Sequence, residues 1–319
     1  MKVLIVTNMY PGHNPDSTQQ GIFVQEQMNS LTKDHNVQCE LFVIEGFKSS
    51  LNYLTTALKL NFYLMFNKFD AIHVHYGLSG LFMLVNPLKR KWKNVVLTCH
   101  GADIQIQHNK ETLANRLCQK VVRKSAQIIT LNESMDGVVA QYNPQITRLP
   151  CGIETDFFNP NDNKPEHVIV FPGRASYDRK NYPLFEKIIN EYRKIVPEVK
   201  IAIMDKMNRD EIKHTLETAS ALLMTSLSEG SPQAVKEALS CDLPVVCTNV
   251  GDVAGIFEGV SGTAIVELED DPAQIAQKLY QCIEQSKTTP GERRARILEM
   301  GFAQKDVTAE LVKLFKQVS

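Results

Sequence analysis

Short apolar runs alternate with longer amphipathic segments along almost the whole chain, and this alternation most restricts the folds that the chain can adopt. Short runs rich in Val, Ile and Leu are typical of buried parallel strands, and the amphipathic segments between them are long enough for helices. Such β/α units build parallel sheets that helices cover on both faces. The 319 residues, 43% of them hydrophobic, suffice for two doubly wound α/β domains.

The alternation predicts the following elements. In the first half, strands are expected at Val3–Thr7, Gln38–Val43, Ala71–His75, Val95–Cys99, Ile128–Leu131 and Ile146–Leu149, and helices at Gly21–Thr32, Leu51–Phe66, Gly80–Leu88, Lys110–Lys124 and Glu133–Gln141. In the second half, strands are expected at Val168–Phe171, Lys200–Met204, Ala221–Thr225, Pro244–Cys247 and Thr263–Val266, and helices at Tyr182–Val196, Arg209–Ser220, Pro232–Ser240, Pro272–Gln285, Gly291–Met300 and Thr308–Val318. The stretch Asn159–Pro165 between the halves holds no apolar residue and predicts a linker.

Composition excludes several classes of protein. Lys and Arg number 35 against 36 acidic residues, so no nucleic-acid partner is expected. The seven cysteines include no Cys-x-x-Cys pair, which argues against a disulfide framework and a zinc ribbon and favours the reducing cytoplasm. No apolar run reaches the roughly 18 to 20 residues that a membrane-spanning helix needs.

The segment Ser226–Leu239 carries the strongest chemical signal, since it leads from an apolar strand into a helix. Gly230 permits a tight turn, Ser231 suits an N-cap and Pro232 suits the first helical position. The free amides at this helix start form a site for a phosphate or for sugar hydroxyls, which Glu229 and Glu237 would border. The alternative is an ordinary strand-to-helix turn.

A second segment, Gly173–Asn181, follows the strand Val168–Phe171. Arg174 and Lys180 leave the carboxyl end of that strand, where a guanidinium fork and an ammonium point charge can grip a diphosphate. The alternative is a solvated basic loop.

These two segments, together with Asp70–His75, Leu97–Asp103 and Pro150–Pro160, occur in an order that resembles the family 4 retaining glycosyltransferases. The resemblance implies the GT-B fold, in which two Rossmann-like domains face a cleft. It implies an acceptor-side domain over residues 1–160 and a nucleotide-sugar domain over 161–300. Residues 301–319 would form a C-terminal helix that crosses back to the first domain.

The resemblance also implies roles for individual residues. Arg174 and Lys180, with Gly173 beside them, would hold the donor diphosphate and replace a metal ion, so no metal is expected. Glu237 would bind the nucleotide ribose. The donor sugar would be contacted by Glu229, by the backbone near Ser231, Pro232 and Gln233, and from the first domain by His100.

On the first domain, the resemblance assigns to Gly21 the glycine that lets backbone approach the phosphates and the acceptor. His75, Tyr76 and Asp103 are expected on the acceptor side. His73 and His75 share one face of a strand, but with no third ligand nearby in sequence a metal pair is disfavoured.

Three features depart from the family pattern. Only about 16 residues separate the strand Lys200–Met204 from Ala221, where family members fit another strand and helix. Gly255 stands near the place of a usual acidic residue, and the phosphate-loop spacing is one residue longer than the commonest pattern.

The first domain also carries a basic run, Lys89, Arg90, Lys91 and Lys93, around the single tryptophan. Beside the apolar segment Leu51–Phe66, this run suggests contact with an anionic membrane. The alternative is an ordinary helix with a solvated, charged end.

The leading hypothesis is a metal-independent retaining hexosyltransferase in cell-surface polysaccharide or glycoconjugate synthesis, in the cytoplasm or at the inner face of the membrane. The donor would be a nucleotide-diphosphate sugar, with UDP or GDP favoured over ADP, and the acceptor a glycan or a lipid-linked molecule. Alternatives are a nucleotide-sugar epimerase and a non-catalytic sugar-nucleotide or glycan-binding subunit. A nicotinamide dehydrogenase is disfavoured, because no Gly-x-Gly-x-x-Gly follows either domain's first strand.

Overall fold

The computed structural model describes the chain except for residues 15–18, 87–90, 105–110 and 162–166. The described residues form two compact units. Unit 1 contains Met1–Gly152 and Gln304–Ser319, and unit 2 contains Ile153–Ala303. The boundary falls earlier than the predicted residue 160, because Ile153 and Phe158 are buried in the core of unit 2. The predicted linker at 159–165 lies partly outside the described residues.

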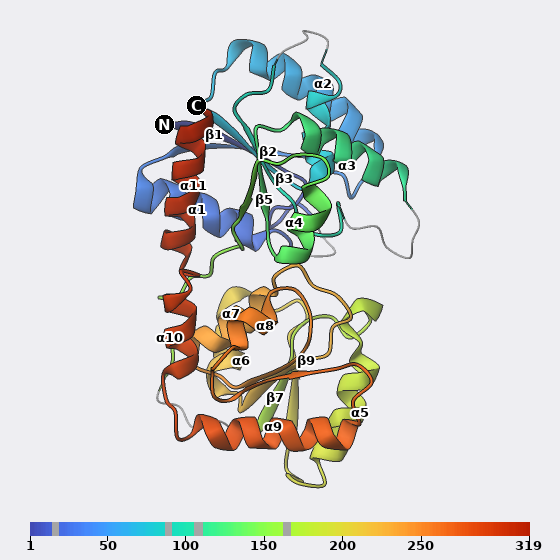
Figure 1. Ribbon diagram of the computed structural model, residues 1–319, viewed down its shortest axis with the longest axis vertical. Coiled ribbons are helices and arrows are strands. Elements are labelled where there is room, and N and C mark those ends of the chain that lie inside the picture. Colours follow the sequence, from blue (N-terminus) through green and yellow to red (C-terminus); the bar gives the residue numbers. More distant parts are fainter. Residues whose placement is uncertain (15–18, 87–90, 105–110, 162–166) are drawn as a thin grey trace. The chain divides into compact units, whose positions relative to one another are not determined.

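Unit 1 is built on a parallel sheet of six strands in the order β2-β1-β3-β4-β5-β6 (Figure 1). The strands are β1 (Lys2–Thr7), β2 (Gln38–Val43), β3 (Ala71–His75), β4 (Val95–Thr98), β5 (Gln127–Thr130) and β6 (Ile146–Arg148). The helices are α1 (Ile22–His35), α2 (Leu51–Phe66), the 3-10 helix η1 (Gly77–Met83), α3 (Leu113–Lys124), α4 (Glu133–Val139) and α11 (Gln304–Val318).

Successive side chains of each strand point to opposite faces of this sheet. Val3 and Ile5 of β1 join one apolar cluster with residues of α1 and α11, whereas Leu4 and Val6 join another with residues of α2, η1 and α3. Because both faces are covered, most residues of the inner strands β1, β3 and β4 are apolar, which explains why these strands could be located from sequence.

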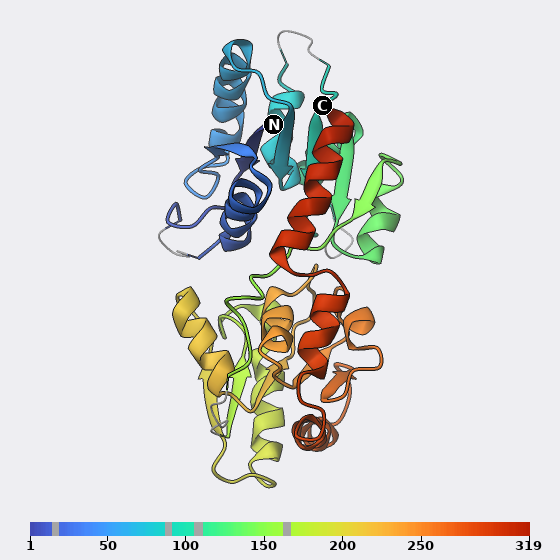
Figure 2. The same ribbon diagram turned by 90° about the vertical axis from the view of Figure 1, so that its left-hand side faces the viewer.

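Helix α11 returns to unit 1 after the chain has passed through unit 2, and Figure 2 shows it running along unit 1. Leu311 and Phe315 are buried in the same cluster as Val24 and Leu31 of α1. The hydroxyl of Thr308 lies 2.8 Å from that of Ser30, in a buried contact.

Unit 2 repeats the plan with a five-stranded parallel sheet in the order β11-β10-β9-β7-β8. The strands are β7 (Val168–Phe171), β8 (Lys200–Ile203), β9 (Ala221–Met224), β10 (Val245–Thr248) and β11 (Thr263–Val266). The helices are α5 (Tyr182–Tyr192), α6 (Arg209–Thr218), α7 (Gln233–Ser240), α8 (Val253–Phe257), α9 (Pro272–Ser286) and α10 (Glu292–Glu299), with a 3-10 turn, η3, at Asp178–Lys180. As expected, α6 alone joins β8 to β9.

One predicted helix needs correction, and one helix was not predicted. The helix expected at Gly80–Leu88 is the 3-10 helix η1, which begins earlier, at Gly77; residues 87 and 88 lie outside the described part of the chain. A Cβ on Gly80 would lie 2.4 Å from Val121 of α3, so close packing shapes this segment more than helical periodicity does. The five-residue helix α8 was not predicted, since so short a segment carries no readable period.

The seven cysteines are unpaired. Among the residues that the structure describes, no helix has both the length and the apolar character needed to cross a membrane.

Candidate functional site

Three loops meet at the carboxyl edge of the unit 2 sheet, after β7, β9 and β10. The backbone amide of Leu227 donates to the oxygen of Arg179 (2.8 Å), and the hydroxyl of Thr225 donates to the oxygen of Asn181 (3.0 Å). The hydroxyl of Thr248 donates to the oxygen of Ser226 (2.6 Å). Ligands of open parallel sheets bind at this edge. The three hydrogen bonds connect the loops that carry the residues predicted to bind the donor.

Lys180 and Glu229 are joined directly at this edge. The Lys180 ammonium lies 2.7 Å from the Glu229 carboxylate, and the two side chains are only 17% and 12% exposed. Glu229 also accepts from the hydroxyl of Ser226 at 3.0 Å. Gly173 has φ +130°, and a Cβ there would lie 3.0 Å from the Lys180 side chain. The predicted glycine thus makes room for the lysine.

Arg174 lies in the same loop but pairs with a different carboxylate. Its Nε is 3.1 Å from Asp205, which follows β8, and its guanidinium lies 4.9 Å from the ring centre of Tyr177. The two cations are therefore each balanced by a carboxylate of unit 2, so an anionic ligand here would compete with internal partners.

The start of α7 differs from the prediction that Ser231 is its N-cap. Pro232 occupies the N-cap and supplies no side-chain bond, while the Ser231 hydroxyl donates to the Asp252 carboxylate at 2.6 Å. Burial raises the pKa of Asp252, although Lys236 and the Ser231 bond oppose the shift. Gln233 is the first residue of α7, and Pro232 before it cannot cap the helix with its side chain.

The neighbouring turn packs tightly against this helix start. Gly251 has φ +63°, and a Cβ there would lie 2.8 Å from the oxygen of Gly230. The Gly-Asp turn after β10 thus fixes the Gly-Ser-Pro turn after β9 through one close backbone contact and one hydrogen bond.

Glu237 is held by a residue that sequence analysis missed. The Arg209 guanidinium, at the start of α6, lies 2.7 Å from the Glu237 carboxylate and 4.5 Å from the ring centre of Phe158. Because α6 alone connects β8 to β9, its first residue falls beside α7. The one sequence feature that indicated an unusual arrangement around Glu237 was the short connection between the strand Lys200–Met204 and Ala221.

In unit 1, three histidine rings cluster at the carboxyl ends of β3 and β4. The rings of His73 and His75 are 4.2 Å apart between centroids, and those of His75 and His100 are 5.5 Å apart. Nδ1 of His75 lies 3.3 Å from Nε2 of His100, and Nε2 of His73 lies 2.8 Å from the hydroxyl of Thr98. Phe23 covers His100, with 5.1 Å between ring centroids.

Burial keeps these histidines neutral. It lowers the pKa of His73 to about 3 and that of His100 to about 4, and it holds the pKa of His75 well below the usual range. Each ring therefore carries one N–H donor and one acceptor nitrogen at neutral pH. The cluster can hydrogen-bond to a neutral hydroxyl but offers no positive charge to a phosphate.

Asp103, predicted on the acceptor side, turns inward. Its buried carboxylate accepts from the backbone amides of Gly77 (2.9 Å) and His100 (3.0 Å). Burial raises its pKa, which the amide bonds oppose. His75 is likewise fully buried. In this structure Asp103 holds the loops after β3 and β4, and His100, only partly buried, lies nearer to solvent than His75.

Tyr76 and Gly21 adopt left-handed backbone conformations, with φ +72° and +83°. The amide of Tyr76 donates to the oxygen of Thr98 at 3.0 Å, and burial raises the pKa of its hydroxyl. A Cβ on Gly21 would lie 2.4 Å from the backbone of Met9. The close approach that Gly21 permits in this structure is therefore to the loop after β1.

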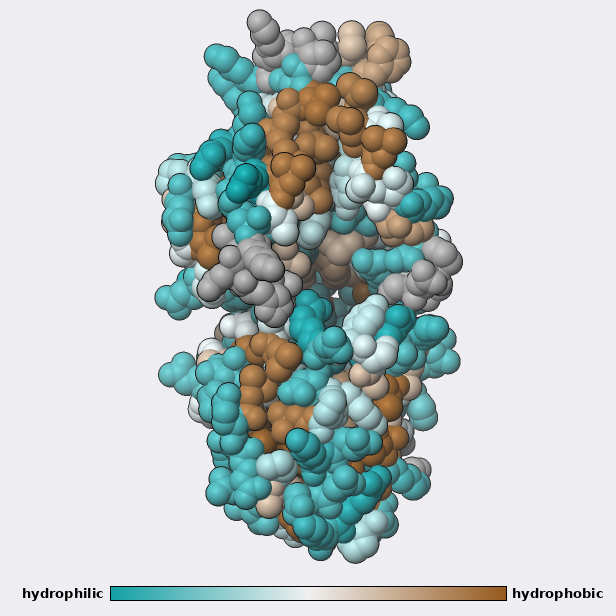
Figure 3. Space-filling model, turned by 90° about the vertical axis from the view of Figure 1, so that its right-hand side faces the viewer, coloured by the Kyte–Doolittle hydropathy of each residue, from teal (hydrophilic) through white to brown (hydrophobic). Residues whose placement is uncertain are grey.

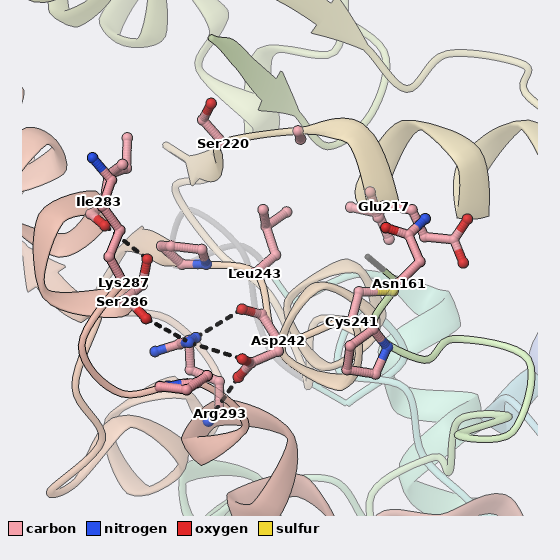
Figure 4. Close-up of a pocket in the computed structure, with 15 residues that line it drawn as sticks. Asn161, Glu217, Ser220, Cys241, Asp242, Leu243, Ile283, Ser286, Lys287 and Arg293 are labelled. Atoms are coloured by element: carbon pink, nitrogen blue, oxygen red, sulfur yellow. Dashed lines mark hydrogen bonds and ion pairs between the residues drawn. The ribbon is translucent and has the colours of Figure 1, made fainter. Parts of the chain in front are cut away.

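A separate cavity of 260 Å³ lies at the opposite edge of the unit 2 sheet (Figure 4). Ser220 and Pro244, which line it, directly precede β9 and β10. Arg293 is buried there, and its guanidinium bonds to the Asp242 carboxylate (3.0 Å) and to the Ser261 oxygen (3.0 Å). These bonds give Arg293 a structural role in joining α10 to the sheet.

Two family models match the chain in the order of its units. The model of glycosyltransferase family 4 matches residues 1–157, and that of the glycosyl transferases group 1 matches residues 187–285. The chain belongs to the family 4 glycosyltransferases. Its two parallel-sheet Rossmann-like units are those of the GT-B fold, as the sequence resemblance predicted.

A curated relative is TuaC of Bacillus subtilis (strain 168), named for teichuronic acid biosynthesis, with 22% identity over 214 residues. That alignment covers 59% of this chain and 55% of TuaC, so the chain matches little more than half of the relative's length.

Solved structures of glycosyltransferases share the fold. Sucrose-phosphate synthase of Thermosynechococcus elongatus has a TM-score of 0.79 at 14% identity, covering 99% of this chain and 98% of that one. Anabaena HepE, in complex with UDP, has a TM-score of 0.70 at 13% identity, covering 99% and 100%. S. aureus TarM has a TM-score of 0.66 at 15% identity, covering 82% and 59%.

Proposed function

We propose that this protein is a retaining, metal-independent glycosyltransferase that moves a hexose from a nucleotide diphosphate to a glycan or lipid-linked acceptor. The observation that carries the proposal is the partly buried Lys180–Glu229 pair just before the N-terminal end of α7. A cation, a carboxylate and backbone N–H donors at one sheet edge offer partners for a diphosphate and for sugar hydroxyls together.

Arg174 and Lys180 take the role of leaving-group stabilisers in this proposal. As the sugar departs, negative charge develops on the diphosphate, and preorganised cations lower the energy of that state. The diphosphate would replace Asp205 beside Arg174 and share Lys180 with Glu229, which is then available to a sugar hydroxyl. We expect the leaving phosphate to help deprotonate the acceptor on the same face, so no enzyme nucleophile is assigned.

Glu237 is proposed to bind the ribose hydroxyls, with Arg209 orienting its carboxylate through the 2.7 Å pair. Gly173, Ser231, Pro232 and Gln233 complete the donor side as the loop and helix start. On unit 1, His100 is proposed to contact the donor sugar as a neutral hydrogen-bonding group.

The choice of nucleotide and acceptor is supported by relatives. HepE and TarM were solved with UDP, which favours a UDP donor here over GDP and ADP. The TarM complex also holds α-GlcNAc-glycerol, and TuaC is named for teichuronic acid biosynthesis. We infer that the acceptor belongs to a cell-surface polysaccharide or glycoconjugate.

Ligand-dependent thermal stability tests the donor site directly. UDP, GDP, ADP and their common sugar conjugates are added with EDTA to wild type, Arg174→Ala and the control Arg179→Ala, whose side chain is exposed in the same loop. A nucleotide at 100 times its Kd stabilises by about 2.7 kcal/mol. We expect one nucleotide to stabilise wild type and the control, and Arg174→Ala to lose the effect.

Several outcomes contradict the proposal. Stabilisation by no nucleotide supports the non-catalytic alternative, and stabilisation only with added divalent metal removes metal independence. Conversion of the donor sugar without any acceptor supports an epimerase. With an acceptor extract, NMR of the product's anomeric proton decides between retention and inversion.

A further inference from the structure

Helix α2 exposes a continuous apolar stripe, here called the α2 face: Leu51, Leu54, Leu58, Phe62, Met65 and Phe66. Their spacing of three or four residues places them within about 120° of the helix circumference. Phe62 and Phe66 are 65% and 71% exposed, and their rings meet edge to face at 5.2 Å. Figure 3 shows a hydrophobic region on this side of unit 1.

Packing within unit 1 does not need this stripe. The opposite side of α2 buries Ala57, Leu60 and Leu64 against the sheet. Asn61 fastens that side to η1 and the segment after it, since its amide donates to the oxygens of Phe82 (2.9 Å) and Val85 (2.6 Å). The helix therefore presents two apolar sides, of which one is buried and the other faces outward.

Basic residues outnumber acidic ones in the part of the sequence that contains the α2 face. Asp70 is the single acidic residue between Glu45 and Asp103 in the sequence. Lys59 and Lys68 are exposed on and just after α2, and among the described residues neither has an ion-pair partner.

A second segment adds positive charge at the C-terminal end of the helix. Lys91 and Lys93 are exposed on either side of the buried Trp92. The side-chain amide of Asn94 donates to the oxygen of Phe69 at 2.9 Å, which places this segment near the end of α2. The other two members of the predicted basic run, Lys89 and Arg90, lie outside the described residues.

We propose that the α2 face docks unit 1 on an anionic lipid bilayer, with Phe62 and Phe66 entering the headgroup boundary and the lysines contacting acidic headgroups. An exposed apolar stripe flanked by lysines is the pattern of an interfacial helix. A second copy of the chain fits less well, because a twofold contact through this face would bring its lysines toward their own copies. The 16 residues of α2 are too few to span the bilayer.

Sedimentation with vesicles tests the proposal. The full chain is mixed with vesicles of phosphatidylcholine alone or of equimolar phosphatidylcholine and phosphatidylglycerol. We expect wild type to bind the anionic vesicles and Phe62→Ser with Phe66→Ser to weaken binding by more than about tenfold, since two apolar side chains are lost. The matched control, Leu268→Ser with Leu298→Ser, replaces two exposed apolar residues of unit 2 and should bind like wild type.

Charge and insertion are measured separately. Lys59→Gln with Lys68→Gln should lower affinity for the anionic vesicles and reduce its dependence on salt. Phe62→Trp should show a blue-shifted emission with these vesicles, against the constant signal of the buried Trp92.

Three results would overturn the proposal: wild type that stays in the supernatant, equal binding to neutral and anionic vesicles, or undiminished binding by the double serine variant. A dimer in light scattering that the serine variant dissolves, without any vesicle binding, would assign the α2 face to a second copy. Unchanged thermal melting of the variants shows that they fold, as their exposure leads us to expect.

Discussion

The carboxyl edges of the two sheets differ in charge: one holds ion pairs, and the other holds neutral histidines. In unit 2 the edge holds three pairs of opposite charge, at 2.7 Å for Lys180–Glu229, 2.7 Å for Arg209–Glu237 and 3.1 Å for Arg174–Asp205. In unit 1 the corresponding edge holds three histidines kept neutral by burial. Under the proposed function a phosphate would replace an internal carboxylate at the first edge, whereas the histidines that the structure describes at the second edge offer neutral hydrogen-bonding groups.

This contrast fits the division of ligand groups between the two units that we propose. Ion pairs that are partly buried keep charges ready and oriented, so replacing one anion by another costs little reorganisation. A desolvated histidine cluster disfavours any added charge, because protonation there must overcome burial. We therefore expect unit 2 to stabilise the charge on the leaving group and unit 1 to bind uncharged hydroxyls.

The largest effect is expected from breaking the charged edge. Lys180→Ala removes a leaving-group cation and should lower kcat by about 10²–10³-fold, measured as transfer from the donor that the thermal panel identifies. The exposed neighbour in Arg179→Ala should keep turnover close to wild type. Normal turnover in Lys180→Ala would show that the charged edge is structural.

Acid should affect unit 1 through its histidines. Because their pKa values are lowered in the folded state, the unfolded chain binds more protons below about pH 6.5, and stability falls as pH decreases. Each neutral histidine contributes a slope of up to about 1.4 kcal/mol per pH unit, down to its folded pKa. The raised pKa of Asp103 opposes this at the acidic end.

Urea unfolding at several pH values between 7 and 5 measures that slope. His73→Gln should reduce it, while His214→Gln, at an exposed position of α6 in unit 2, should not. If the free energy of unfolding is independent of pH in this range, the histidine cluster is not desolvated in solution.

A smaller effect, a loss of stability, is expected from a substitution at Gly21, whose backbone conformation supports the carboxyl edge of unit 1. Gly21→Ala forces a Cβ into the left-handed region and within 2.4 Å of the Met9 backbone, and should destabilise by about 1–3 kcal/mol. Gly255→Ala in α8 meets no atom within 4 Å and should be neutral or stabilise by up to about 1 kcal/mol. Equal melting temperatures for the two variants would show that the loop after β1 gives way.

The smallest effect is expected at Ser231. Ser231→Ala removes one hydrogen bond to Asp252 and should cost about 0.5–1.5 kcal/mol of stability. Because this hydroxyl does not cap α7, nucleotide binding in the thermal panel should persist. Loss of that binding would mean that the hydroxyl contacts the donor itself.

Strand positions were predictable because strands buried on both faces read as continuous apolar runs, as in Val168–Phe171 and Ala221–Met224. The loop residues Lys180 and Glu229 were predictable as site candidates because each follows a strand of the same sheet. Their mutual contact needed the sheet order, in which β7 and β9 are neighbours.

Other features had no local signal. The pairing of Arg209 with Glu237 joins residues from two helices, and Arg209 by itself reads only as a residue in the first turn of α6. Asp103 reads as a polar loop residue, although its carboxylate accepts two backbone amides that only the fold brings to it. Ser231 reads as an N-cap because nothing in its own segment indicates that Asp252 competes for its hydroxyl.

The division of unit 1 into two stretches of sequence has a consequence for the order of folding during synthesis. Leu311, Leu314 and Phe315 of α11 complete the apolar cluster that covers Val3, Ile5 and α1, and they leave the ribosome only after all of unit 2. Until then the part of that face and of α1 that α11 covers is open to water. Unit 2 is contiguous and can fold as soon as it emerges, so the unit begun first is the last to be closed.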